Sequence, residues 1–104
     1  MAVSAFTTIV APIAEAQIEA ALVWWARHRA GARELLAREM DAAIGTIEQV
    51  PQIGRRTRSR QFRDVRRLLL RGSGYHLYYQ VSHERREIRI VYFRHARRQP
   101  LPRR

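Results

Sequence analysis

The sequence contains no cysteine, which excludes disulfide bonds, iron–sulfur clusters and thiol catalysis and is typical of a cytosolic protein. It also contains no lysine: all 20 basic residues are arginine, so no lysine is available as a general base or for a Schiff base. The longest apolar run, Ala20–Ala26, has seven residues and is far too short to span a membrane. No basic segment leads into an apolar one at the start of the chain, so we expect no signal peptide and a cytoplasmic location.

Positive charge, in contrast, is abundant and unevenly spread. The 104 residues carry a formal net charge of +11, and their 46% hydrophobic content predicts one folded domain, 1–104. Residues 1–50 hold four Arg against six acidic residues, a net of −2, whereas residues 51–104 hold sixteen Arg against three, a net of +13. We therefore expect the second half to face a negatively charged partner, either nucleic acid or an acidic protein or peptide.

Residue types and spacing in the first half predict a strand followed by two helices. The β-branched and aromatic segment 6–10 is typical of a strand. Pro12 suits the first turn of a helix, and apolar residues at three-and-four spacing continue that helix to about Arg29. A second apolar stripe predicts a helix over 32–49 that ends at Pro51, so that the two helices form a hairpin.

In the second half the hydrophobic period falls from about 3.6 residues to about 2, which predicts strands. A polar loop with five Arg occupies 52–64, and strands are expected over 65–70, 75–81 and 87–94. The tail 97–104 is expected to be mobile. The predicted fold class is α+β with the order β-α-α-β-β-β, in which a helical hairpin covers one face of a small antiparallel sheet.

The alternation of side chains along these strands distinguishes a covered face from an uncovered one. On the uncovered face we expect Tyr78, Val91 and Phe93 beside His76 and several Arg, with Tyr92 on the covered face. A sheet that is covered on one side is normally polar on its other side. An apolar patch rimmed by cations therefore predicts a surface that binds a partner.

Other chemistries are excluded by spacing. The four His have no Cys partners and no ligand spacing, so neither a metal nor any other cofactor is expected. The segment Gly72-Ser73-Gly74 precedes no helix, which predicts a hairpin turn and not a phosphate-binding loop. No Ser lies in the context of a Ser-His-acid triad.

Taken in order, the motifs of the chain resemble those of the RelE/ParE family, the toxins of type II toxin–antitoxin pairs. The resemblance covers all but the extreme ends of the chain and depends on the order and spacing of the motifs together. These are Trp24-Trp25, Pro51-Gln52-Ile53-Gly54, Val65-Arg66-Arg67-Leu68-Leu69-Leu70, Gly74-Tyr75-His76-Leu77-Tyr78-Tyr79-Gln80-Val81, Glu87–Tyr92 and His95-Ala96-Arg97-Arg98.

The resemblance implies a small sheet with a helical hairpin and a cognate antitoxin that wraps the toxin in a hetero-oligomer. Two activities occur on this fold: RelE-like members cut mRNA in the ribosomal A site, and ParE-like members poison DNA gyrase. RelE-like members carry an Arg where this chain has His76, and no Tyr follows the C-terminal cluster here. These departures favour a ParE-like inhibitor of DNA gyrase that acts by binding. A ribosome-dependent mRNA endoribonuclease is the alternative.

The two interpretations assign different residues. A nuclease would use His76 and His95 as an acid–base pair with Arg97 and Arg98, although the two imidazoles can equally be a half-exposed strand residue and a structural cap. A binding module would contact gyrase or antitoxin through side chains of the second half, namely Arg55, Arg56, Arg66, Arg67, Tyr78, Phe93, Arg94, Arg97 and Arg98. Which of Arg66 and Arg67 faces the partner stays open, because a one-residue shift of register exchanges them.

Overall fold

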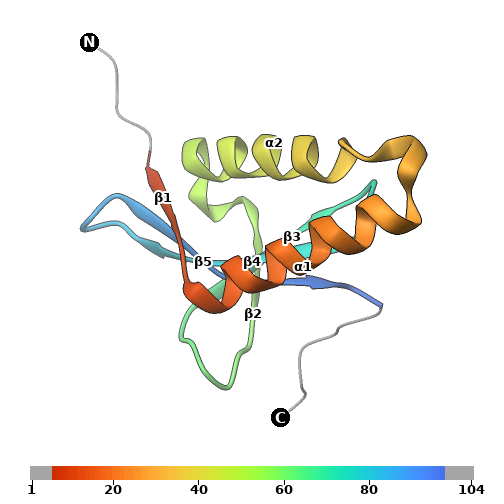
Figure 1. Ribbon diagram of the computed structural model, residues 1–104. Helices are drawn as coiled ribbons and strands as arrows, with labels where there is room; N and C mark the ends of the chain where they lie inside the picture. The colour runs from red at the N-terminus through yellow and green to blue at the C-terminus, as the bar shows by residue number, and fades with distance from the viewer. Residues whose placement is uncertain (1–5, 98–104) are drawn as a thin grey trace.

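The computed structural model describes residues 6–97, so the predicted mobile tail lies, from Arg98 onward, outside the described residues. In chain order the elements are β1 (Thr7–Val10), α1 (Pro12–His28), α2 (Leu35–Gln49), β2 (Arg55–Thr57), β3 (Val65–Leu70), β4 (Tyr75–Ser82) and β5 (Glu87–His95), with short 3-10 turns at Ala30–Ala32 and Pro51–Ile53 (Figure 1). In the described part of the chain, no helix is long and apolar enough to cross a membrane.

The five strands form one mixed sheet in the order β1-β5-β4-β3-β2. The predicted α+β class is confirmed, and the strands from β5 to β2 are antiparallel to their neighbours. At the edge, however, β1 runs parallel to β5, with Thr7 opposite Glu87. Two helices separate β1 from the rest of the sheet, so no hairpin connection dictates its direction. The segment 52–64 is not entirely loop either, because β2 pairs with β3 as a fifth strand.

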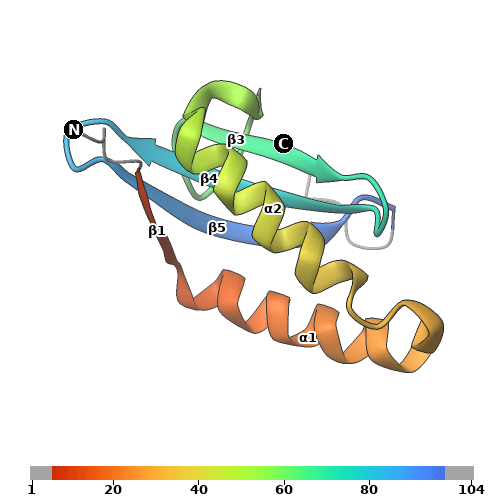
Figure 2. The same ribbon diagram turned by 90° about the horizontal axis from the view of Figure 1, so that it is seen from above.

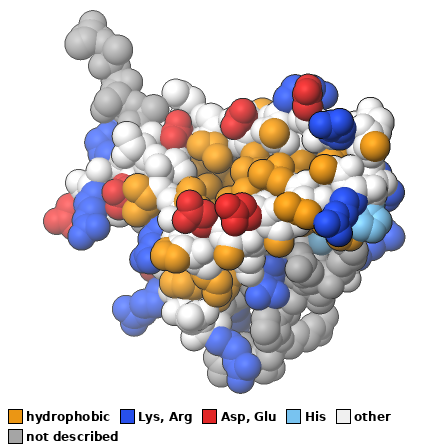
Figure 3. All heavy atoms as spheres, in the orientation of Figure 1, with side chains coloured by type: hydrophobic (Ala, Val, Ile, Leu, Met, Phe, Trp, Pro, Cys, Tyr) orange, Lys and Arg blue, Asp and Glu red, His pale blue; other side chains and the backbone are white. Residues whose placement is uncertain are grey.

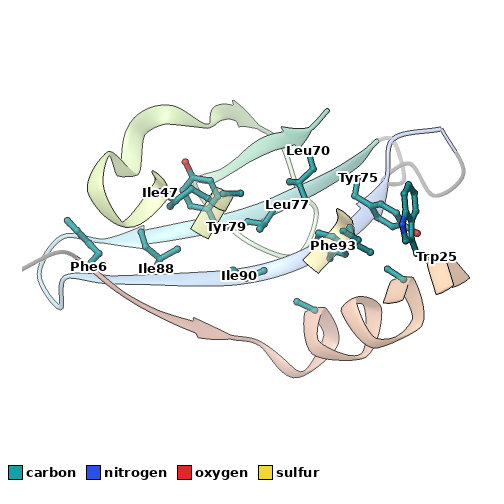
Figure 4. Close-up of a cluster of buried hydrophobic side chains, with 14 residues drawn as sticks. Phe6, Trp25, Ile47, Leu70, Tyr75, Leu77, Tyr79, Ile88, Ile90 and Phe93 are labelled. Carbon is teal, nitrogen blue, oxygen red and sulfur yellow. The ribbon is translucent and has the colours of Figure 1, made fainter. Parts of the chain in front are cut away.

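Both helices cover the same face of the sheet and bury their apolar sides against it. Figure 2 shows α2 lying across β3 and β4 while α1 runs alongside β5. α1 also closes the edge of β5 beyond β1, because the Phe93 N–H donates to the Gln17 side chain at 2.7 Å. In the core shown in Figure 4, Tyr75 and Phe93 stack with ring centroids 4.9 Å apart, close to Trp25 of α1. Within residues 6–97, no helix lies over the opposite face of the sheet.

A buried tyrosine fastens the segment after α2 to the sheet. The Tyr79 hydroxyl donates to the Pro51 carbonyl at 2.7 Å and accepts the Gly54 N–H at 2.8 Å. Burial raises the pKa of Tyr79, against the opposing effects of the Gly54 hydrogen bond and the Arg66 charge, so the hydroxyl keeps its proton. This arrangement fixes where β2 begins.

A second polar contact joins α2 to the turn between β3 and β4. The carboxylate of Glu39 accepts hydrogen bonds from the backbone N–H groups of Gly72 and Ser73. The contact spans more than thirty residues of sequence and holds the hairpin of β3 and β4 against the helices.

Candidate functional site

The face of the sheet opposite the helices, which we call the open face, is formed by alternate residues of four strands. They are Arg55 and Thr57 of β2, Val65, Arg67 and Leu69 of β3, His76, Tyr78 and Gln80 of β4, and Arg89, Val91, Tyr92 and Arg94 of β5. This face carries four of the nine side chains that the sequence analysis assigned to binding, namely Arg55, Arg67, Tyr78 and Arg94.

The alternation of β3 sends its two arginines to opposite faces. Arg66 is paired with Tyr79 on the helix-covered face. There its Nη1 donates to the carbonyls of Gly54 at 2.8 Å and Gln52 at 3.2 Å. Arg67 lies on the open face, so it is the one of the two that faces a partner. Arg66 instead supports the connection that follows α2.

A β-bulge changes which faces the end of β5 presents. The registers on its two sides leave Val91 as an extra residue between Ile90 and Tyr92. The bulge turns Tyr92 onto the open face and Phe93 into the core, so the faces expected for these two residues were wrong. Phe93 is fully buried, with 0% exposure, and is not available as an apolar anchor.

The open face has a small hydrophobic cluster of its own, next to the loop 58–64. It consists of Val65, Tyr78, Val91 and Tyr92, with Phe62 of the loop packed against them. The Tyr92 hydroxyl donates to the Gln61 side chain at 3.0 Å, which fastens the loop over the cluster. Tyr78 is only 3% exposed, so the aromatic anchor expected there is buried in this cluster.

The open face holds three arginines on the strands around His76. Arg94 of β5 lies directly opposite His76, whereas on β3 it is Leu69 that lies opposite. Arg67 of β3 is opposite Tyr78, and Arg55 of β2 is opposite Arg67. None of these arginines takes part in the three ion pairs found among residues 6–97. The Arg94 Cζ lies 5.6 Å from the centroid of the Tyr92 ring, and its buried Nε has no hydrogen-bond partner.

The surroundings of His76 favour its neutral form. Its pKa is lowered from the ordinary value of 6.5, first by burial and then by the positive charges of Arg67 and His95. The ring also meets that of Tyr78 edge-on, with centroids 5.8 Å apart. At neutral pH the open face therefore presents an uncharged imidazole among guanidinium groups.

His95 lies on the other face of the sheet. It is paired with Tyr75, and the two rings meet edge-on in the helix-covered layer with centroids 5.1 Å apart. Its Nδ1 accepts the Arg97 N–H at 3.2 Å, as a structural cap does. His76 and His95 therefore do not form an acid–base pair on one face. Arg97 is exposed just beyond β5, and Arg98 lies outside the described residues.

Arg55 and Arg56, expected in a loop, instead form the start of β2. There Arg55 is opposite Arg67 and Arg56 is opposite Arg66, so like charges occupy both pairs. Arg56 has an acidic neighbour, Asp64, at 3.8 Å. Like charges directly opposite each other destabilise a sheet. Only the pair of Arg55 and Arg67 lies on the open face, where a negatively charged partner can relieve the repulsion.

The sequence analysis missed two features of the site. Leu69 is 40% exposed on the open face. In the run 65–70 each face carries one arginine and two aliphatic residues, so the sequence contains no signal that places Leu69 there. β2 is only three residues long, too short for a recognisable alternation. Only the pairing with β3 identifies it, and pairing cannot be seen in one segment of sequence.

The chemistry available to the open face is anion binding. Guanidinium groups donate forked hydrogen bonds to phosphate or carboxylate oxygens and cannot act as bases at neutral pH. Within the described range 6–97, no group of three or more His, Cys, Asp or Glu is placed to hold a metal ion. The face is suited to holding a negatively charged partner.

Comparison with known proteins gives a family and a fold. The sequence matches the family described as "ParE toxin of type II toxin-antitoxin system, parDE" over residues 9–100. Among solved structures, it is similar to the chromosomal ParDE system from P. aeruginosa with a TM-score of 0.64 and 19% identity, covering 86% of this chain and 95% of that chain. No curated protein sequence matches.

Two E. coli structures are similar as well. A double mutant of the toxin RelE in the free state gives a TM-score of 0.54 at 24% identity, covering 89% of this chain and 85% of that chain. The intact RelBE toxin-antitoxin complex gives 0.51 at 24% identity, covering 90% of this chain and 100% of that chain. At these identities the structures establish the fold alone.

Proposed function

Because the chain belongs to the family of ParE toxins of type II toxin–antitoxin systems, we propose that it arrests growth by binding DNA gyrase and that a cognate antitoxin neutralises it in a hetero-oligomer. The toxin acts through its open face, by occupying a surface of the target and without breaking a bond itself. The proposal places this action in the cytoplasm.

The observation that carries the proposal is the group of arginines around His76. Arg55, Arg67 and Arg94 take no part in the ion pairs found in the described part of the chain. A concentrated positive surface attracts a negatively charged partner and speeds its association. Gyrase together with the DNA that it holds is a partner of that kind.

The positions of the two histidines argue against the RelE-like alternative. Cleavage of RNA at a ribose 2′-OH needs a base and an acid within hydrogen-bond reach of the same substrate. His76 and His95 lie on opposite faces of the sheet. Arginine side chains offer hydrogen-bond donors and no acceptor, so the Arg cluster cannot supply the base. Binding, and not bond cleavage, is therefore the activity that we assign.

A different surface suits the antitoxin. α1 packs on the sheet by one side only, and its outer side bears a mainly apolar groove. The groove is lined by Ala16, Ala20, Val23 and Trp24, together with the polar residues Glu19, Arg27 and His28. Val23 is 55% exposed. Figure 3 shows hydrophobic side chains gathered on this helix-bearing side of the molecule. An amphipathic helix laid along α1 would cover them, and two similar structures are described as toxin-antitoxin assemblies.

A supercoiling assay tests the proposed function. DNA gyrase, relaxed plasmid and ATP are mixed with increasing amounts of antitoxin-free protein. We expect loss of supercoiling with trapped, cleaved DNA, and we expect Arg67→Glu to abolish it. Arg33→Glu makes the same charge change at an exposed position between the helices and is the matched control. Uninhibited gyrase from a preparation that still arrests growth would contradict the proposal and move the target to ribosome-bound mRNA.

A further inference from the structure

The charged groups that face His76 come from every strand beside it and are all basic. Arg94 of β5 is directly opposite His76. On β3, Leu69 is opposite His76, and Arg67 lies diagonally from it, opposite Tyr78. Arg55 of β2 adds a third guanidinium next to Arg67. His95 acts on His76 from the far side of the sheet. No acidic residue of the described part forms an ion pair with the three arginines, so the charge of the group is uncompensated.

The aromatic residues of this face are buried, so they offer a peptide few exposed apolar anchors. Tyr78 is 3% exposed and Tyr92 is 6% exposed, so the exposed apolar group near His76 is Leu69, at 40%. Protein interfaces usually depend on a few aromatic or apolar anchors in pockets at their centre. Nucleic acid, in contrast, is held mainly through its phosphates by basic side chains. The balance of groups at this site favours phosphate.

We infer that Arg67, His76 and Arg94 form a binding site for the phosphodiester backbone of nucleic acid, and that occupation of the site is coupled to uptake of a proton by His76. The inference deepens the proposed function and rests on it in one respect: the same open face would touch the DNA that gyrase holds.

The surroundings of Arg94 favour binding of an anion. Its guanidinium lies over the Tyr92 ring, at 5.6 Å from Cζ to the ring centroid, and its buried Nε lacks an acceptor. A partly desolvated cation without a counter-ion gains more from an anion than a fully hydrated one does. The ring fixes the side chain, so less rotamer freedom is lost on binding.

Proton uptake follows from the same geometry. In the free protein, burial and the nearby cations disfavour the charged form of His76 and lower its pKa. A phosphodiester between Arg67 and Arg94 neutralises that repulsion and favours the imidazolium, which takes its proton from solvent. Both ring nitrogens then donate hydrogen bonds. Linkage requires the converse as well, so acidification must tighten binding of the anion.

The test measures binding of short fluorescent oligonucleotides of DNA and RNA to the full-length chain by anisotropy between about pH 5 and pH 8. We expect affinity to rise as the pH falls, by at most about tenfold per pH unit for one proton. His76→Gln should abolish this rise, whereas His83→Gln, which changes an exposed histidine in the turn between β4 and β5, should keep it. NMR titration of the His76 ring should give a higher pKa with oligonucleotide than without.

The arginines are tested at low and moderate salt. Arg67→Gln or Arg94→Gln should weaken binding and reduce the slope of log affinity against log salt by about one contact. Arg33→Gln, on the helix side, is the control. Variants are compared only where thermal unfolding shows an intact fold. If Arg94→Gln fails to fold, Arg67→Gln alone is sufficient to test the contribution of the arginines. Wild-type pH dependence in His76→Gln, or equal losses in Arg67→Gln and Arg33→Gln, would overturn the inference.

The oligonucleotide experiment contains no gyrase, so it separates the two proposals. Inhibited gyrase with no pH-coupled oligonucleotide binding overturns the phosphodiester site and leaves the function standing. Conversely, pH-coupled oligonucleotide binding without inhibition of gyrase overturns the proposed function and leaves the phosphodiester site standing. A preference between DNA and RNA identifies the source of the phosphodiester. Displacement of the oligonucleotide by an equally charged poly-glutamate peptide at lower concentration would assign the site to an acidic protein and overturn the inference.

Discussion

Arg66 and Tyr79 are directly opposite each other on neighbouring strands, and between them they hold both backbone groups of Gly54. The Arg66 guanidinium donates to the Gly54 carbonyl at 2.8 Å, and the Tyr79 hydroxyl accepts the Gly54 N–H at 2.8 Å. Gly54 immediately precedes β2, which carries Arg55 onto the open face. The covered face of the sheet therefore positions one of the cations on the open face.

Replacing each arginine of β3 separates the structural role from the binding role. Arg66→Gln should lower the free energy of unfolding by about 1.5–3 kcal/mol, because hydrogen bonds from a charged donor to two carbonyls are lost. Arg67→Gln should cost less, because the half-buried Arg67 takes part in no ion pair among residues 6–97 and holds no pair of carbonyls as Arg66 does. Urea unfolding measures both. Equal stability of the two variants would contradict the assignment of Arg66 to the fold.

Tyr79→Phe isolates the hydroxyl of the same contact. The ring stays in the core, but the buried Gly54 N–H loses its acceptor and the Pro51 carbonyl loses a donor. We expect a loss of about 1–3 kcal/mol in the free energy of unfolding. Tyr92→Phe, which removes a hydroxyl bound to the side chain of Gln61 near the surface, is the matched control and should cost less. A larger loss of unfolding free energy in Tyr92→Phe than in Tyr79→Phe would show that the buried contact contributes little.

Gly54 should not accept a side chain. A Cβ at this position would lie 2.6 Å from the Tyr79 hydroxyl oxygen and 3.0 Å from the Arg67 carbonyl oxygen. Gly54→Ala should therefore destabilise the protein and displace β2. Gly45→Ala is the control, because nothing lies within 4 Å of a Cβ there and alanine favours a helix. Thermal unfolding that orders the two variants the other way would contradict the close packing.

Most of the fold could be predicted from the sequence because its helices and three longer strands each have a regular apolar period. The alternation of β4 was sufficient to place His76 and Tyr78 on one face. β5 could not be assigned in the same way. Val91, Tyr92 and Phe93 are all compatible with either face, so the sequence contains no sign of the bulge. The bulge arises only when β4 and β5 pair.

The candidate site was less predictable than the fold for a related reason. Its charge was evident from composition, but the choice between Arg66 and Arg67 depends on a register that a single strand does not specify. The separation of His76 from His95 depends on the bulge between them in the ladder. The direction of β1 was missed because pairing between segments at opposite ends of the chain is a tertiary property.

Glu39 is expected to hold the turn between β3 and β4. Its carboxylate accepts from two backbone N–H groups, and Glu39→Gln leaves only one oxygen for both. We expect faster amide hydrogen exchange at Gly72 and Ser73, with a smaller change elsewhere, because local opening of the turn becomes easier. Asp41→Asn, at an exposed position two residues further along the same helix, is the control. Unchanged exchange at both amides would contradict the role of Glu39.

The lowered pKa of His76 makes stability depend on pH in a defined direction. In the unfolded chain this imidazole takes up a proton as the pH falls through its ordinary value of 6.5, whereas in the fold burial and Arg67 delay protonation to lower pH. The unfolded state therefore binds more protons in this window, and stability should fall as the pH is lowered below about 6.5. His76→Gln removes the titrating group and should flatten this part of the profile of unfolding free energy against pH. His83→Gln should retain the wild-type slope. A profile for His76→Gln that coincides in slope with wild type across the window would mean that His76 titrates in the fold as it does in the unfolded chain.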